Sequence, residues 1–339
     1  MRPEALIADF GKTIVAWQHR HGRHTLPWQN TRDPYRVWLS EIMLQQTQVA
    51  TVLGYYERFL ARWPRVTDLA AATLDEVLAQ WAGLGYYSRA RNLHACARAV
   101  AELHGGEFPR TAAGLQTLPG IGRSTAAAIA AFCFGERVAI LDGNVKRVLT
   151  RVLAFEGDLA SSAAEKQLWN RATELLPERE VDRYTQGLMD LGATVCTARS
   201  PNCLLCPVQP LCGAQQAGEP TRYPIKTRKL KRGWRENWWL WLEREGQVLL
   251  QQRPATGVWA GLWTLPMFDD EAGARAAVPG AHLETLPRIQ HALTHFDWVL
   301  HTMRAGSPSG ETPGGTWVAR EKLADYALPA PLKKLIEES

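Results

Sequence analysis

Long apolar segments are missing from this sequence of 339 residues. No run of roughly eighteen or more apolar residues occurs, which excludes a conventional membrane-spanning helix. The first residues, MRPEALIADFGKT, lack the charged and then apolar pattern of a secretory signal. Internal repeats and low-complexity tracts are missing too, which excludes repeat and fibrous architectures. We therefore expect a globular protein of the cytoplasm.

The excess of positive charge is also small. The chain has 39 basic and 34 acidic residues, so its net charge is +5, which permits a polyanionic partner without requiring one. The length allows two domains with separate cores. The 14 tryptophans are divided between both halves of the chain, which favours two aromatic cores over one binding surface.

Cysteines are few, and four of the 6 are close together. Cys96 and Cys133 stand alone in apolar helical stretches, and we interpret them as small buried hydrophobic residues. The other four are Cys196, Cys203, Cys206 and Cys212. Because a reducing compartment disfavours structural disulfides, this cluster indicates a metal or iron–sulfur site.

The clustered cysteines have the spacing C-x6-C-x2-C-x5-C. Four thiolates in one loop can hold zinc or a [4Fe–4S] cluster. Zinc sites usually consist of two close C-x-x-C pairs, so this irregular spacing favours the iron–sulfur cluster. We expect the loop 196–212 to have a structural and positioning role, with Arg199 as a candidate phosphate contact.

Residues 1–215 show the periodicity of helices separated by short breaks. Asp33 and Pro34 supply an N-cap and a first-turn proline for a helix that runs through Gln45. Further helices are predicted over 74–81, 88–103 and 123–134.

The composition changes after the cysteine cluster. Residues 221–235, TRYPIKTRKLKRGWR, hold seven Lys or Arg and no acid. This segment is either a solvated connector or a phosphate-binding stretch, and both interpretations stay open. Strand-like alternation follows, with a hairpin around Glu245 and Gly246. The predicted organisation is a helical domain (1–215), a basic linker (216–236) and an α+β domain (237–339).

The segment LPGIGRST at 118–125 opens an alanine-rich helix. Gly120 and Gly122 leave backbone N–H groups uncovered at the helix N-terminus, where the helix dipole also favours an anion. A phosphate can therefore dock there without a charged side chain. This is a helix-hairpin-helix signature, which is weak alone but specific between two helices and beside the cysteine loop.

Together, the hairpin and the cysteine loop resemble the endonuclease III superfamily of DNA glycosylases and, within it, the MutY-type adenine glycosylases. The resemblance covers nearly the whole chain. It rests on LPWQNTRDPYRVWLSEIMLQQTQV at 26–49, WAGLGYYSRARNL at 81–93, LPGIGRSTAAAI at 118–129 and LDGNVKRVLTR at 141–151. It implies an all-α glycosylase domain with a [4Fe–4S] cluster, a Nudix-like C-terminal domain, and a substrate of double-stranded DNA with adenine opposite 8-oxoguanine or guanine.

Two carboxylates are the catalytic pair that this resemblance implies. Glu41 is the general acid that protonates adenine at N7, and Asp142 stabilises the charge that develops at C1′ of the sugar. Glu41 lies on a largely apolar helix, where desolvation favours the protonated form. Asp142 precedes a helix, whose positive end favours the ionised form. Without the resemblance, a surface Glu and an N-cap Asp are the plain alternatives.

The resemblance also implies DNA contacts. Gln46 and Tyr86 are candidates to fill the gap left by a flipped base, with ordinary packing as the alternative. Asn144 supports the Asp142 pocket. Ser124 stands where the strand-cleaving branch carries a lysine that forms a Schiff base, so we predict a monofunctional glycosylase.

The stretch QQRPATGVWAGLWTLPMF resembles a Nudix module, but the following DDEAGARAAV lacks the R-E-x-x-E-E arrangement that holds Mg²⁺. Pyrophosphohydrolase activity is therefore not expected. The family's Phe-Ser-His recognition loop corresponds to Leu293-Thr294-His295. The Thr294 hydroxyl can accept the N7–H of 8-oxoguanine, whereas Leu293 cannot replace the aromatic contact.

Two other functions fit part of the sequence. An oxidised-pyrimidine glycosylase with lyase activity would share the fold, but Ser124 and the added C-terminal domain argue against it. A catalytically silent DNA-binding protein would have lost Glu41 and Asp142, and both are present in their motifs. We expect a monomer, because one set of active-site residues serves one lesion.

Overall fold

A computed structural model describes residues 3–227, 231–306 and 312–338. It divides into two compact units. The first unit comprises Met1–Gln46, Arg65–Thr67 and Cys96–Lys229, and the second comprises Thr47–Pro64, Asp68–Ala95 and Leu230–Ser339. Both units contain helices from the first part of the chain. Within the described ranges, no helix is long and apolar enough to cross a membrane.

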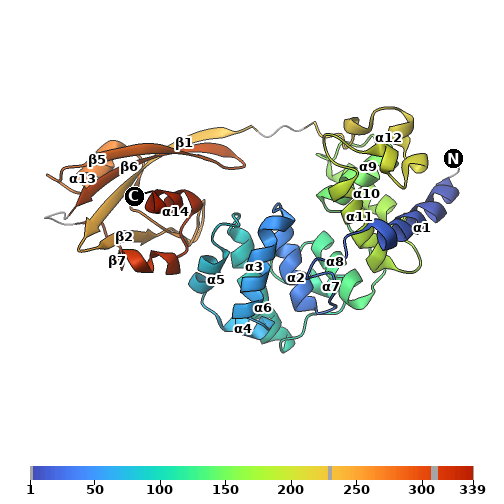
Figure 1. Ribbon diagram of the computed structural model, residues 1–339, viewed down its shortest axis with the longest axis horizontal. Coiled ribbons are helices and arrows are strands. Elements are labelled where there is room, and N and C mark those ends of the chain that lie inside the picture. Colours follow the sequence, from blue (N-terminus) through green and yellow to red (C-terminus); the bar gives the residue numbers. More distant parts are fainter. Residues whose placement is uncertain (1–2, 228–230, 307–311, 339) are drawn as a thin grey trace. The chain divides into compact units, whose positions relative to one another are not determined.

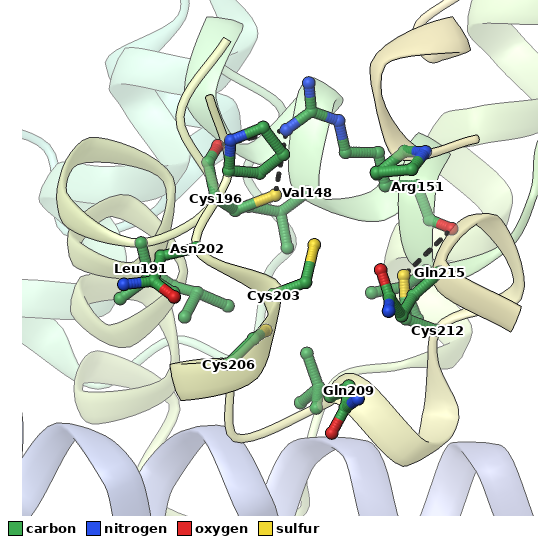
Figure 2. Close-up of a pocket in the computed structure, with 15 residues that line it drawn as sticks. Val148, Arg151, Leu191, Cys196, Asn202, Cys203, Cys206, Gln209, Cys212 and Gln215 are labelled. Atoms are coloured by element: carbon green, nitrogen blue, oxygen red, sulfur yellow. Dashed lines mark hydrogen bonds between the residues drawn. The ribbon is translucent and has the colours of Figure 1, made fainter. Parts of the chain in front are cut away.

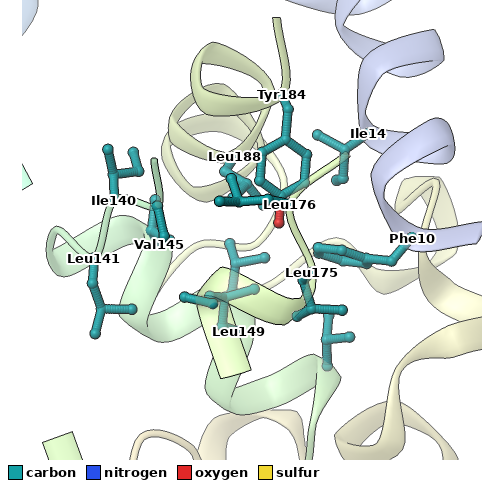
Figure 3. Packing of buried hydrophobic residues seen from close by; sticks show 14 of the residues in the cluster. Phe10, Ile14, Ile140, Leu141, Val145, Leu149, Leu175, Leu176, Tyr184 and Leu188 are labelled. Carbon is teal, nitrogen blue, oxygen red and sulfur yellow. The ribbon is translucent and has the colours of Figure 1, made fainter. Parts of the chain in front are cut away.

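The first unit is helical (Figure 1). Its helices are α1 (Pro3–His21), α2 (Pro34–Leu44), α7 (Ala112–Leu115), α8 (Arg123–Phe134), α9 (Gly143–Val152), α10 (Ser162–Glu174), α11 (Val181–Thr194) and α12 (Gly213–Gln216). Apolar side chains from α1, α9 and α11 meet in one buried cluster, which includes Phe10, Val145 and Leu188 (Figure 3). This core fixes the start of α9, where Asp142 lies.

Local signals in the sequence explain where several helices begin and end. The Asp33 side chain accepts a hydrogen bond from the Tyr35 backbone N–H at 2.9 Å and caps α2, and Pro34 occupies its first turn. Helix α8 ends at Gly135, whose φ of 69° closes the helix in the left-handed conformation. The helices predicted over 74–81, 88–103 and 123–134 are confirmed.

The second unit contains α3 (Val49–Arg62) and α5 (Leu74–Trp81), while α4 (Val66–Ala71) and α6 (Ser88–His104) are divided between the units. A reciprocal capping box starts α5: Thr73 Oγ1 accepts from the Glu76 N–H, and Glu76 accepts from the Thr73 N–H. The ring of Phe59 packs edge-on against Trp81, with 5.9 Å between centroids, and joins α3 to α5.

The rest of the second unit is a mixed sheet with helices α13 (Glu271–Ala276) and α14 (Ala330–Glu337). Its strands are β1 (Gly233–Arg244), β2 (Gln247–Gln252), β3 (Trp263–Thr264), β4 (Met267–Phe268), β5 (Glu284–Ala292), β6 (Phe296–Gly306) and β7 (Thr316–Ala319). The order is β3-β2-β1-β6-β5, with β4 on β1 and β7 on β2. Strands β1 and β6 are parallel, and the other pairs are antiparallel.

The hairpin between β1 and β2 is confirmed. Glu245 and Gly246 both have positive φ angles, of 51° and 73°, as a tight two-residue turn requires. The predicted linker 216–236 needs a correction at its end, because β1 begins at Gly233, where pairing with β6 starts. Residues 228–230 of that linker lie outside the described residues. The predicted boundaries of the helical and α+β domains stay predictions.

Candidate active site and iron–sulfur site

Asp142 is the N-cap of α9 in the first unit. Its carboxylate accepts hydrogen bonds from the backbone N–H of Val145, at 2.7 Å, and from that of Asn144. Burial raises the pKa of Asp142, while these N–H groups and the charges of Arg147 and Lys146 act in the opposite direction. The predicted position at a helix end is confirmed. The helix end favours the ionised form, as expected, while burial acts against it and is the larger effect on the pKa.

Glu41 lies on α2 in the same unit, half-buried beside the buried side chains of Leu39 and Ile42. Burial, and to a smaller extent the charge of Asp142, raise the pKa of Glu41 to about 8. At neutral pH Glu41 therefore carries a proton that it can donate. The sequence could pair the two carboxyl groups only by resemblance, and in the fold the charge of one acts on the other.

The helix hairpin between α7 and α8 exposes Gly120 and Gly122. Gly120 has a φ of 74°, and Gly122 is the N-cap of α8, where no Cβ covers the backbone. Ser124 follows in the first turn, and its Oγ accepts a hydrogen bond from the Leu141 N–H at 3.0 Å. Through this bond, Ser124 joins α8 to the residue before Asp142. The sequence did not reveal this role of Ser124.

Asn144 and Arg147 extend the Asp142 site toward the cysteine loop. The Arg147 guanidinium donates to Asn144 Oδ1 at 2.8 Å, to the Gly192 carbonyl at 2.7 Å and to the Cys196 carbonyl at 2.8 Å. A Cβ on Gly192 would lie 2.7 Å from the Cβ of Asn144, so only glycine allows α11 to approach α9 this closely. Arg147 was not singled out from the sequence, although its motif was.

Gln46 and Tyr86 share an uncommon backbone conformation. Their φ angles are 58° and 48°, and both side chains are exposed. A non-glycine residue in this region carries strain of about 1–3 kcal/mol, which persists only where the surroundings enforce it and is frequent at functional sites. The two predicted base-gap residues are therefore presented on constrained turns.

Arg89 enforces the turn that carries Tyr86. Its guanidinium is nearly buried, with 8% of the residue exposed, and donates to Thr47 Oγ1 at 3.1 Å, to the Leu84 carbonyl at 3.1 Å and to the Gly85 carbonyl at 3.2 Å. It also lies 5.5 Å from the centroid of the Tyr86 ring. Arg89 was missed from the sequence, because nothing in SRARNL distinguishes a buried arginine from an exposed one.

We expect Arg89→Gln to lower the free energy of unfolding by about 2 kcal/mol, because buried carbonyl groups lose a charged donor. We also expect weaker DNA binding, since the Tyr86 turn loosens. Denaturant titration and duplex binding measure the two effects. Arg98→Gln is the control on the same helix, where Arg98 pairs with exposed Glu102 and should contribute less than about 0.5 kcal/mol. Equal losses in both variants would contradict the role of Arg89.

The turn between β5 and β6 carries Thr294 and His295, both exposed. The Leu293 N–H donates to the Phe296 carbonyl at 2.9 Å and closes this turn. Within the second unit, the hydroxyl groups of Thr294 and Tyr86 lie 3.0 Å apart. Two residues predicted for DNA contact from distant parts of the sequence are therefore neighbours.

The four clustered cysteines surround one space after the end of α11 (Figure 2). Two short 3-10 helices, Cys203–Leu205 and Gln209–Leu211, fold the loop so that all four thiols line the same cavity. Among the described residues, no three His, Cys, Asp or Glu side chains are grouped closely enough to hold a single metal ion. Thiols spread around one cavity fit a [4Fe–4S] cluster, in which each thiolate binds a different iron atom.

Arg151 contacts this loop through a buried guanidinium group and was also missed. It is 1% exposed, and its guanidinium donates to Cys196 Sγ at 3.3 Å, to the Thr197 carbonyl at 2.7 Å and to the Ala198 carbonyl at 2.9 Å. A buried cation beside thiolates offsets part of their charge. Arg199 is exposed in the same loop, and its contact with phosphate stays a prediction.

Three parts of the chain match known protein families. Residues 39–174 match the HhH-GPD superfamily of base excision DNA repair proteins, residues 196–212 the iron-sulfur binding domain of endonuclease III, and residues 237–338 the NUDIX domain. Fold and site therefore define a helix-hairpin-helix DNA glycosylase with an iron–sulfur loop and a Nudix-like domain. The predicted fold class and [4Fe–4S] cofactor are confirmed.

Curated relatives identify the family within this class. The adenine DNA glycosylase of Buchnera aphidicola subsp. Baizongia pistaciae is 39% identical over 342 residues, which cover 96% of this chain and 95% of the relative. The adenine DNA glycosylase of Homo sapiens is 34% identical over 408 residues, which cover 98% of this chain and 74% of the relative. The chain belongs to the adenine DNA glycosylase family. It is a base excision repair enzyme that hydrolyses N-glycosidic bonds in duplex DNA.

Solved structures agree with this fold. A thermostable thymine-DNA glycosylase superposes with a TM-score of 0.58 at 29% identity, covering 64% of this chain and 100% of its own. A trapped covalent intermediate of endonuclease III with DNA gives a TM-score of 0.55 at 23% identity, covering 64% of this chain and 99% of its own. The second likeness shows the fold alone.

We expect Cys203→Ala to lose bound iron and to lower the free energy of unfolding by roughly 3 kcal/mol or more, because a structural metal centre contributes directly to folding. Iron content, visible absorption and thermal unfolding measure the effect. Cys96→Ala is the control, since Cys96 is buried outside the loop and should keep its iron at a cost of about 1 kcal/mol. Full iron content in Cys203→Ala would contradict the ligand assignment.

Proposed function

We propose that the enzyme removes adenine paired with 8-oxoguanine, or with guanine, in duplex DNA, and that it acts as a cytoplasmic monomer. The observation that carries this proposal is the pair formed by protonated Glu41 and Asp142 at the start of α9. The two groups supply the acid and the negative charge that cleavage of an N-glycosidic bond requires. The names of the relatives support adenine as the base that is removed.

In this mechanism, Glu41 donates its proton to N7 of the flipped adenine. The electron pair of the bond between C1′ and N9 passes to the base, and the sugar gains oxocarbenium character. Asp142, whose carboxyl group is largely buried, stabilises that positive charge. A water molecule then adds its oxygen to C1′ and loses a proton, which leaves an abasic site and free adenine.

We propose that the reaction stops at base removal. Strand cleavage requires an amine that forms a Schiff base with C1′, and Ser124 offers a hydroxyl whose oxygen already accepts the Leu141 N–H. The oxygen that adds to C1′ therefore comes from water. The expected product is an intact strand with an abasic site.

We propose that Thr294 accepts the N7–H of 8-oxoguanine, that His295 contacts the same strand, and that Gln46 and Tyr86 fill the gap left by the flipped adenine. The 3.0 Å distance between the Tyr86 and Thr294 hydroxyl groups supports a shared place on the lesion strand. Gly120 and Gly122 then offer backbone N–H groups to a phosphate of the adenine strand.

In this proposal, the Nudix-like domain does not hydrolyse pyrophosphate. Helix α13 has a single acidic residue, Glu271, and its carboxylate pairs with Arg275 at 2.7 Å. A site for Mg²⁺ needs several carboxylates on one face. Lesion recognition through Thr294 is the role that we assign to this domain.

The experiment follows base removal under single-turnover conditions in three duplexes, with adenine opposite 8-oxoguanine, adenine opposite guanine, or an oxidised pyrimidine. Products are resolved with and without alkali. We expect alkali-dependent cleavage at adenine, fastest opposite 8-oxoguanine. Cleavage of the pyrimidine strand alone, and without alkali, would replace this proposal with a bifunctional endonuclease III activity. Binding without base release would indicate a catalytically silent DNA-binding protein.

A further inference from the structure

The start of β1 presents side chains that the proposed reaction does not use. Trp234 is 62% exposed, whereas Trp239 and Trp241 of the same strand are completely buried. Arg232 and Arg235 flank Trp234 in the sequence and are exposed too. The strand therefore begins with an indole between two guanidinium groups, all facing solvent.

This segment is joined to the turn that carries Thr294. The Gly233 N–H donates to the His295 carbonyl at 2.8 Å, and in the parallel ladder Gly233 lies opposite Phe296 and Trp234 opposite Asp297. A Cβ on Gly233 would lie 3.6 Å from the Cβ of Phe296. Because neighbouring strand residues point to opposite faces, Trp234 lies on the face of Asp297 and Arg235 on the face of Phe296. Both faces meet the Thr294 turn at this end of the sheet.

The two arginines are held in ways that leave both available to an anion. The Arg235 guanidinium stacks over the Phe296 ring at 4.3 Å and, within the described residues, makes no hydrogen bond or ion pair. Stacking fixes the group but leaves its N–H donors unused. Arg232 pairs with Asp297, and their side chains are 45% and 57% exposed. Since water screens such a pair, a phosphate can replace Asp297 as its partner.

We propose that Arg232, Trp234 and Arg235 form a second DNA-binding surface, which holds the sugar-phosphate backbone of the strand that contains 8-oxoguanine. Guanidinium groups bind phosphates with paired N–H donors, and an exposed indole packs on a sugar or an accessible base. Charge favours DNA over a protein partner, because residues 221–235 contain seven Lys or Arg and no acid. The inference rests on the proposed function, since it takes the Thr294 turn to face that strand.

The same strand supplies a matched control. At its other end, Arg244 stacks over Trp317 with 4.4 Å to the ring centroid, nearly the same geometry as Arg235 over Phe296. The two arginines are separated by about 30 Å along the strand. Arg235→Gln and Arg244→Gln therefore remove the same kind of exposed stacked charge, but only Arg235 lies beside the Thr294 turn.

The experiment measures the binding of the full-length enzyme to a duplex with adenine opposite 8-oxoguanine across a series of salt concentrations. Asp142→Asn is the parent, so that the substrate stays intact. We expect Arg235→Gln and Arg232→Gln each to reduce the slope of log affinity against log salt by about 1, and Trp234→Ala to weaken binding roughly tenfold. Arg244→Gln should match the parent. The losses should be equal opposite guanine and opposite 8-oxoguanine, because backbone contacts carry no base specificity.

Separate outcomes test the surface and the proposed function. If Arg232→Gln and Arg235→Gln bind like Arg244→Gln with an unchanged salt slope, the surface does not contact DNA, while adenine excision by the wild-type enzyme would still support the proposed function. If the wild-type enzyme excises no adenine and the parent does not bind the duplex, both fail. Should Trp234→Ala not fold, Trp234→Phe and the two exposed arginine variants decide the question.

Discussion

Asp142→Asn should keep its fold, and its rate of base excision should fall by about a thousandfold or more. The amide keeps an oxygen that can accept the Val145 N–H, and asparagine caps a helix as well as aspartate does. It cannot offset positive charge on the sugar, and in a site with little water a single such interaction is worth a factor of about 10²–10³ or more in rate. Single-turnover excision of adenine opposite 8-oxoguanine measures the loss, and thermal unfolding measures the fold.

A matched control exists on another helix. Asp270 is the N-cap of α13 and accepts the Gly273 N–H at 2.7 Å, the same bond that Asp142 makes with Val145. Asp270→Asn should therefore unfold like the wild type and excise adenine at the wild-type rate. If Asp142→Asn kept more than about a tenth of the wild-type rate, the charge of Asp142 would not be needed in the transition state.

Elements with strong local signals could be predicted from the sequence. Asp33 with Pro34 marks the start of α2, Gly135 marks the end of α8, and Glu245 with Gly246 forms the hairpin turn. In each case a residue and its immediate neighbours determine the backbone. The boundary at Gly233 could not be predicted in this way, because its hydrogen bond reaches His295 on a distant strand.

The residues of the candidate site could be predicted from the sequence. Their pKa shifts, buried contacts and backbone angles could not. Motifs indicated Glu41 and Asp142, yet the effect of Asp142 on the pKa of Glu41 depends on long-range packing within the first unit. Arg89, Arg147 and Arg151 were missed for the same reason. An arginine within a helix is usually exposed, and only long-range packing turns it into a donor to buried carbonyl groups. The positive φ angles of Gln46 and Tyr86 likewise have no signal in LQQTQ or GLGYY.

Excision should decline above a pH of about 8, because Glu41 must be protonated to donate to adenine and burial raises its pKa to about 8. The rate should then fall about tenfold for each further pH unit. At the acidic side it should fall as Asp142 becomes protonated, at a higher pH than an ordinary aspartate, since burial raises its pKa too. A single-turnover pH profile measures both limbs. A rate that rises above pH 8 would mean that Glu41 acts as a base.

Glu41→Gln should reduce the rate of excision at least about a hundredfold. It should also remove the decline of the rate at alkaline pH. The exposed Glu102→Gln on α6 is the control and should keep both. The protonation of Glu41 also affects the free energy of unfolding, and this effect depends on pH. Because the folded-state pKa of Glu41 lies above its ordinary value of 4.5, the folded protein binds more protons than the unfolded chain between that value and about 8.

The stability that Glu41 contributes is therefore complete below a pH of about 4.5 and is lost as the pH rises through about 8. Glutamine does not titrate, so Glu41→Gln should become more stable relative to the wild type as the pH increases over this range. Thermal unfolding of both proteins at several pH values measures the difference. A constant difference would mean that Glu41 is solvated in the folded enzyme, and that the acid in the reaction is another group.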